Sequence, residues 1–78
     1  MPRYLFHMSI AAAYIHDYEG VALANDTAAR KRAVEDIMAV WTAGAVKRQN
    51  PATCAVVVSN DNRELFRVPF VEALGVGR

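Results

Sequence analysis

Alternating apolar and polar side chains near the N-terminus predict two strands. From residue 2 to residue 8, every second side chain is apolar, as in a strand with one buried face: Pro2, Tyr4, Phe6 and Met8. We expect this face to point toward the core. Residues 14–16 predict a short second strand that returns antiparallel to the first. Residues 17–20 then form a turn, because Gly20 is free to take positive φ.

The only long helical pattern runs from residue 26 to about residue 43. No proline interrupts it, and apolar side chains recur on one side at 100° per residue: Ala29, Ala33, Val34, Ile37, Met38, Val40, Trp41 and Ala45. Asn25 or Asp26 suits the N-cap, since either side chain can accept a hydrogen bond from the free amides of the first turn. We therefore expect a helix whose apolar side, Met38 and Trp41 included, lies in the core.

The C-terminal part of the chain has the pattern of a hairpin. Residues 53–59 are rich in valine and predict the strongest strand. Residues 60–63 predict a tight turn, because Asn and Asp tolerate left-handed backbone conformations. Residues 64–70 predict the returning strand, with Pro69 at its end or on a sheet edge. Residues 71–74 predict a turn of helix, and residues 75–78 are expected to fray.

The order strand, strand, helix, strand, strand predicts an α+β fold in one domain over residues 1–78, with its ordered core at about 2–74. We expect an antiparallel sheet of three to four strands with one long helix on one face. The third strand is apolar on both faces, with Val56 and Val58 on one and Val57 on the other. One helix covers one face, and the core of so short a chain is thin. A second copy of the chain is therefore expected to cover part of the other face.

Composition narrows the class of protein further. The formal net charge is +1 in 78 residues, so the whole domain has no strong attraction to nucleic acid or to an anionic membrane. No run of about 18 apolar residues occurs, which predicts no transmembrane helix. Cys54 is the lone cysteine, as expected in a reducing cytoplasm. It is predicted to be a small core side chain rather than a reactive thiol.

Several short segments together resemble one family of small bacterial proteins. They are Met-Pro-Arg-Tyr-Leu-Phe-His at the start, Asp-Tyr-Glu-Gly at 17–20, Leu-Ala-Asn at 23–25, Ala-Ala-Arg at 28–30 and Val-Pro-Phe at 68–70. The chain is similar over most of its length to a family of uncharacterised proteins common in alphaproteobacteria. Leu5, Asn25 and Asn62 depart from the residues usual there, which are phenylalanine, aspartate and glycine. The family has no assigned activity, so the resemblance implies the order of elements and no catalytic residue.

Arg30 is the candidate site residue that the helical pattern singles out. It falls on the apolar side in the first turns of the helix, where the helix dipole opposes a cation, so it needs a carboxylate partner. Asp17 and Glu19, just before the helix, are the expected partners. One interpretation is a structural clasp that holds the turn at residues 17–20 against the helix. The alternative is an anion or substrate site at the start of the helix.

The remaining polar residues predict no further site. His7 and His16 lie on neighbouring strands, but a metal site needs three or four convergent ligands, and we expect neither a metal nor another cofactor. Lys31 and Arg32 could contact phosphate, yet Glu35 and Asp36 offset them at helical spacing. No serine has the sequence context of a nucleophile, and no paired acid and base occur. We therefore expect a protein that is not an enzyme.

The sequence leaves three classes of function open. The leading hypothesis is a small interaction or regulatory module, homodimeric and without catalysis, which acts through its sheet edges or its second apolar sheet face and could also bind another protein. The second is a nucleic-acid-linked regulator, because two strands, an acidic turn and then a helix resemble the element order of the HicB antitoxin domain. The third is a small enzyme, for which a ligand against Arg30 or the histidines would be needed.

Overall fold

The computed structural model describes residues 1–44, 46 and 49–75. The elements follow in the order β1 (Arg3–Ile10), β2 (Ala13–Ile15), β3 (Val21–Ala22), α1 (Asp26–Thr42), the 3-10 turn η1 (Pro51–Thr53), β4 (Cys54–Asn60), β5 (Arg63–Pro69) and α2 (Phe70–Leu74). The predicted strands, helix and terminal helical turn are confirmed to within two residues at every end, while β3 and η1 were not predicted. The predictions for Ala45 and residues 76–78 lie outside the described residues. Gly75, predicted to fray, caps α2 at φ 71°.

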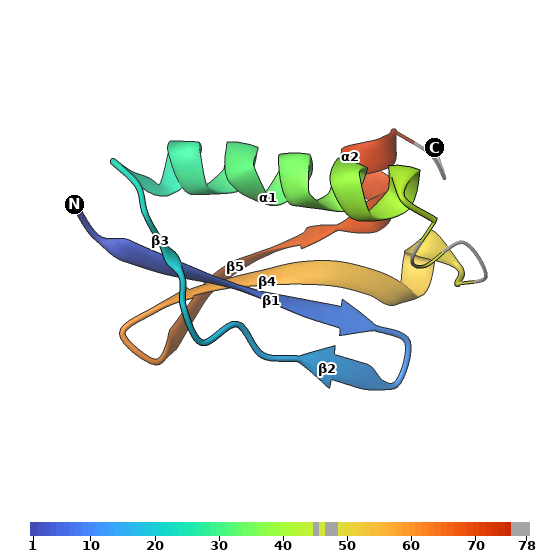
Figure 1. Ribbon diagram of the computed structural model, residues 1–78, viewed down its shortest axis with the longest axis horizontal. Helices are drawn as coiled ribbons and strands as arrows, with labels where there is room; N and C mark the ends of the chain where they lie inside the picture. The colour runs from blue at the N-terminus through green and yellow to red at the C-terminus, as the bar shows by residue number, and fades with distance from the viewer. Residues whose placement is uncertain (45, 47–48, 76–78) are drawn as a thin grey trace.

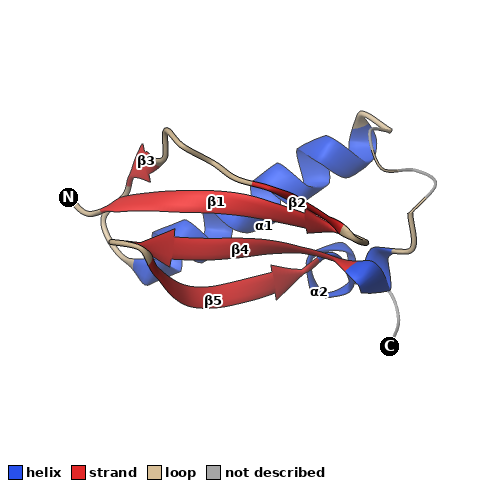
Figure 2. Cartoon of the chain, turned by 90° about the horizontal axis from the view of Figure 1, so that it is seen from below, coloured by secondary structure: helices blue, strands red, loops and turns tan. Residues whose placement is uncertain are grey.

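The strands form one antiparallel sheet in the order β2-β1-β4-β5, and the two-residue β3 also pairs with β1. The predicted α+β class with one long helix on one face is confirmed. Strands β1 and β4 lie at the centre, with Leu5 opposite Ser59 and Ile10 opposite Cys54. Helix α1 lies along one face of the sheet (Figure 1). Seen from below, the strands lie in front of the helix and their other face is not covered by it (Figure 2). We call this second face the open face.

Small side chains let α1 approach the sheet closely. Ala29, Ala33 and Ile37 are fully buried along its inner side. The helix begins after Asn25, whose side chain accepts a hydrogen bond from the Ala28 amide at 2.9 Å, as expected for an N-cap. Met38, however, is 44% exposed, so its prediction as a core residue is wrong. Alanines on the neighbouring turns meet the sheet first, and the longer methionine points toward solvent.

The core lies between α1 and the helix-facing side of the sheet. Its buried members include Tyr4, Cys54, Val56, Val58, Val68 and Phe70. Trp41 is half-buried and meets the ring of Phe70 edge to face at 6.5 Å between centroids, so α2 closes one end of the core. The prediction that Cys54 is a core side chain is confirmed, since it is 3% exposed.

The connections have the backbone conformations that the turn residues favour. Asp61 and Asn62 have φ of 53° and 63°, and two positive φ values in succession are typical of the tight turn that joins β4 to β5. Tyr4 ties β1 to the start of the helix, because its hydroxyl donates to Asp26 Oδ1 at 2.8 Å. Burial and this bond to a carboxylate raise the pKa of Tyr4.

Candidate functional site

The predicted site residue Asp17 holds the turn before the helix. It does so by accepting hydrogen bonds from backbone amides rather than by pairing with Arg30. Its Oδ2 accepts a hydrogen bond from the Phe6 amide at 3.0 Å. Its Oδ1 accepts from the amides of Glu19 at 3.0 Å and Gly20 at 3.3 Å. One carboxylate therefore fixes residues 17–20 onto strand β1.

Gly20 is the residue that lets this turn close. It has φ of 74°, and a Cβ atom there would lie 2.8 Å from the Tyr4 carbonyl oxygen. Burial by itself would raise the pKa of Asp17, but the three amide donors and the nearby His7 outweigh it and lower the pKa below its usual value. The turn thus carries a stable negative charge.

Arg30 does not pair with Asp17 or Glu19 among the described contacts, and the predicted clasp is therefore corrected. Its Nη1 lies 3.4 Å from Glu72 Oε2, and its guanidinium lies 4.5 Å from the centre of the Phe66 ring. The helical angle had indicated the direction of Arg30 around the helix correctly, but α2 and β5 lie on that side. The side chain is 49% exposed, so it is not the partly buried cation that the clasp required.

Glu19 and Arg32 also have partners other than Asp17 and Arg30. The Glu19 carbonyl oxygen accepts a hydrogen bond from Arg3 Nη1 at 2.7 Å. Arg32 Nε lies 3.1 Å from Asp36 Oδ1, which confirms that an acidic residue on the helix offsets the basic run. The structure therefore does not bring Asp17, Glu19 and Arg30 together into one site.

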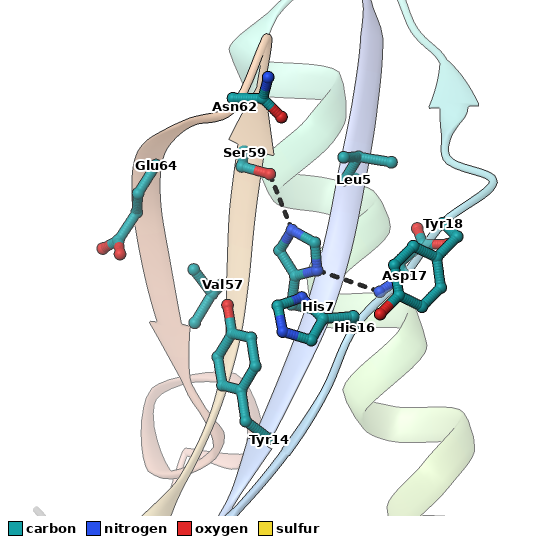
Figure 3. Close-up of a pocket in the computed structure, with 10 residues that line it drawn as sticks. All are labelled: Leu5, His7, Tyr14, His16, Asp17, Tyr18, Val57, Ser59, Asn62 and Glu64. Carbon is teal, nitrogen blue, oxygen red and sulfur yellow. Dashed lines mark hydrogen bonds between the residues drawn. The ribbon is translucent and has the colours of Figure 1, made fainter.

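A cavity that the sequence did not predict lies on the open face. It has a volume of about 330 Å³ and opens to solvent. Strands β1, β4 and β5 supply its floor and one side, and residues 14–18 supply the other side (Figure 3). The lining residues are Leu5, His7, Tyr14, His16, Asp17, Tyr18, Val57, Ser59, Asn62 and Glu64. Val57 is only 2% exposed, so this side of β4 is covered within the chain, and its burial needs no second copy.

His7 and Ser59 form a buried polar pair at the floor of the cavity, where they are 9% and 7% exposed. The Asp17 amide donates to His7 Nδ1 at 3.0 Å, and His7 Nε2 lies 2.9 Å from Ser59 Oγ. A backbone amide can only donate, so Nδ1 is an acceptor, and the neutral ring then carries its hydrogen on Nε2. His7 therefore donates to Ser59. In a serine nucleophile the direction is reversed, because the histidine must accept the serine proton.

Four rings form a connected row along the cavity. The ring of His7 stacks on Tyr14 at 5.8 Å between centroids and meets His16 edge to face at 5.4 Å. His16 in turn meets Tyr14 at 4.8 Å and stacks on Tyr18 at 5.7 Å. Tyr14 is 44% exposed and Tyr18 is 85% exposed. The row thus begins in the protein interior and ends in solvent.

The charged groups of the cavity are carboxylates. Asp17 and Glu64 line it, and no lysine or arginine is among its described lining residues. Glu64 accepts hydrogen bonds from Arg67 at 2.9 and 3.3 Å, and these bonds lower the pKa of Glu64. Among residues 1–44, 46 and 49–75, no three His, Cys, Asp or Glu side chains gather in a way that could hold a metal ion. The cavity is suited to a neutral or cationic group with an aromatic or apolar surface.

One signal for this cavity was present in the sequence. Tyr14, His16 and Tyr18 recur at every second position, which places three rings on one side of an extended segment. His7 has the same alternation on β1, opposite to the core-facing residues. The position of Ser59 beneath His7 depends on the β1–β4 register, which no local pattern contains.

Comparison with known proteins assigns the chain to a family. The family model that describes a domain of unknown function, DUF6894, matches residues 3–71. The chain belongs to the DUF6894 family. No curated protein and no solved structure matches the chain. Membership in the DUF6894 family therefore assigns no activity to the chain. In the described part of this DUF6894 chain, no helix combines the length and the apolar character needed to cross a membrane.

Proposed function

We propose that the chain is a non-catalytic interaction module that works as a homodimer through the open face of its sheet. The observation that carries this proposal is the exposure of residues 14–18. The large apolar side chains exposed in the described chain are Met1, Tyr14, Ile15, Tyr18 and Met38. Two of these five, Tyr14 and Tyr18, line the cavity on the open face, whereas Ile15 between them faces the other side of the sheet. A cluster of exposed apolar and aromatic side chains is typical of an interface.

The sheet edges are less suitable for association. Strand β5 carries the charged Arg63, Glu64 and Arg67 and ends in Pro69, while β2 at the other edge has three residues. Charged side chains, proline and short length are the features that prevent edge strands from pairing with another chain. Of the two modes that the sequence left open, the open face is therefore favoured.

The open face is also large enough for a stable dimer. A specific interface buries about 800 Å² on each partner, and the surface of the chain is 5076 Å². A dimer would thus cover about one-sixth of the surface of each copy. The molecule extends 35 × 22 × 20 Å along its principal axes. The open face spans the longest and the shortest of these axes (Figures 1 and 2), which is close to the size that such an interface requires.

The chemistry of the site supports recognition rather than catalysis. His7 donates to Ser59 and accepts from the Asp17 amide, so neither of its ring nitrogens is free to act as a base in this arrangement. A nucleic-acid-linked role receives less support, because the carboxylates of Asp17 and Glu64 line the cavity and repel phosphate. The free thiol of Cys54 is consistent with work in the reducing cytoplasm.

Two variants with equal starting exposure test the proposed face. Tyr14 on the open face and Met38 on the helix are both 44% exposed, so lysine at either position is expected to leave the fold intact. Light scattering coupled to size exclusion is expected to give a dimer for the natural sequence and for Met38→Lys at micromolar concentration. Tyr14→Lys is expected to give a monomer, because the symmetric contact would bring two like charges together.

Two results would contradict the proposal. A natural chain that remains monomeric at these concentrations removes the homodimer. Dissociation by Met38→Lys with no effect of Tyr14→Lys places the interface on the helical side instead.

A further inference from the structure

The buried hydroxyl of Ser59 can donate a hydrogen bond to a group in the cavity. Ser59 is 7% exposed and accepts a hydrogen bond from His7 Nε2 at 2.9 Å. A serine hydroxyl also donates one hydrogen. Within the part of the chain that the structure describes, no acceptor takes this hydrogen. Because the Asp17 amide fixes the direction of the His7 ring, the Ser59 oxygen accepts from His7 and keeps its own hydrogen for a group that enters the cavity, which Ser59 lines (Figure 3). This donor at the floor of the cavity can bind an acceptor that enters it.

The surroundings of Ser59 restrict what that acceptor can be. The Asp17 and Glu64 carboxylates line the same cavity, so an anionic acceptor would be repelled. The rings of Tyr14 and His16 meet edge to face at 4.8 Å beside it, and Val57 adds an apolar floor. A neutral oxygen on an aromatic ring satisfies these conditions together. A phenol has both parts, and its ring can pack against those of the cavity.

Such a phenol stands at the rim of the same cavity. Tyr18 is 85% exposed although it lines the cavity. Its neighbours hold it in place: Asp17 binds the amides of Glu19 and Gly20, and His16 stacks on its ring at 5.7 Å. Tyr18 is therefore presented on a fixed turn, which lowers the entropy lost when it binds.

We infer that this cavity is the socket for Tyr18 of a second copy of the chain, an inference that rests on the homodimer proposed above. In a two-fold dimer the same patch meets itself, so a rim residue of one copy faces the cavity rim of the other. Each Tyr18 enters the partner's cavity, where its oxygen accepts the Ser59 hydrogen and its ring contacts Tyr14 and His16. Buried tyrosines near the centre of an interface contribute a large share of binding energy.

The dissociation constant of the dimer, measured by sedimentation equilibrium, tests the socket. Tyr18→Ala is expected to weaken the dimer at least about thirtyfold, the effect of a central anchor. Ile15→Ala is the matched control: this side chain is 56% exposed in the same segment, but it lies opposite Met8 on the helix-facing side. It is expected to change the dissociation constant less than about threefold.

A double-mutant cycle tests the hydrogen bond itself. Tyr18→Phe and Ser59→Ala are each expected to weaken the dimer by roughly three- to tenfold. The double variant is expected to be no weaker than the weaker single variant, since both changes remove one bond. Circular dichroism shows whether each variant is folded. If Ser59→Ala does not fold, the comparison of Tyr18→Ala with Ile15→Ala tests the socket instead.

The outcomes separate the two proposals. A monomeric natural chain overturns the homodimer and the socket together. A dimer that Tyr14→Lys dissociates but Tyr18→Ala leaves unchanged overturns the socket alone. Independent effects of Tyr18→Phe and Ser59→Ala overturn the hydrogen bond between them.

Discussion

Replacing Asp17 by asparagine tests whether one carboxylate holds the turn at residues 17–20. The asparagine has the same shape but keeps only one carbonyl oxygen. That oxygen can still accept from the amides of Glu19 and Gly20, which both bind Oδ1 in the natural chain. The new NH₂ group then faces the Phe6 amide, which bound Oδ2 at 3.0 Å. Two donors face each other, and the Phe6 amide loses its acceptor.

The expected loss follows from this geometry. A part-buried donor without an acceptor costs about 1–3 kcal/mol, and the two remaining bonds also weaken because the acceptor is no longer charged. We expect the free energy of unfolding to fall by about 2 kcal/mol. In a domain of this size that loss lowers Tm by roughly 8–16 °C. Thermal unfolding followed by circular dichroism at pH 7 measures it.

The pH dependence of the loss provides a second test. The pKa of Asp17 is lowered in the folded chain, so its charge contributes stability that is fully present above the unfolded pKa of 3.8. This contribution is lost as the pH falls through the still lower folded pKa. The stability curves of the natural chain and Asp17→Asn should therefore converge in acid. Glu19→Gln is the control, because the amide of Glu19 is held rather than its carboxylate. Equal melting temperatures for the natural chain and Asp17→Asn at pH 7 would refute the argument.

Two further substitutions test the packing around the helix. Arg30→Met should reduce stability by no more than about 1 kcal/mol, since half-exposed ion pairs contribute about 0–1 kcal/mol and methionine keeps the contact with Phe66. Urea unfolding measures it, and a fall in Tm of over roughly 10 °C would show that Arg30 has partners beyond Glu72 and Phe66. Gly20→Ala should cost at least about 1–3 kcal/mol, because it combines a positive φ with a Cβ 2.8 Å from the Tyr4 oxygen. The control Gly75→Ala has a φ of 71° with nothing within 4 Å and should lose less; equal losses would show that the contact with Tyr4 is not limiting.

Local patterns were sufficient to predict four of the five strands and both α-helices that the structure describes, and the order of these elements. The spacing of Ala29, Ala33 and Ile37 around the helix, and the capping chemistry of Asn25, depend on neighbours within a few residues. The hairpin turn at Asp61 and Asn62 likewise needs only the tolerance of these residues for positive φ. In each case the force that shapes the structure acts between residues close in sequence.

Those local patterns could not predict contacts between elements that lie far apart in the sequence. Arg30 was assigned a carboxylate nearby in sequence, whereas its partner Glu72 comes from α2, 42 residues later. The cavity was missed for the same reason, because Ser59 meets His7 only through the pairing of β1 with β4. A second copy of the chain was predicted to cover the side of β4 that carries Val57. Residues 14–18 of the same chain already cover part of this face, and Val57 is buried without a second copy.

The pairing of β1 with β4 also determines when the chain can fold during synthesis. Ile10 meets Cys54 and Leu5 meets Ser59, so β1 cannot form this pairing until β4, more than 40 residues later, has been made. The β4–β5 hairpin can close locally, and α1 needs only its own residues, but neither buries a core without β1. Loops this long are slow to close. A nascent chain that ends before residue 60 therefore exposes the aromatic face of β1, and the fold forms only after β4 has left the ribosome.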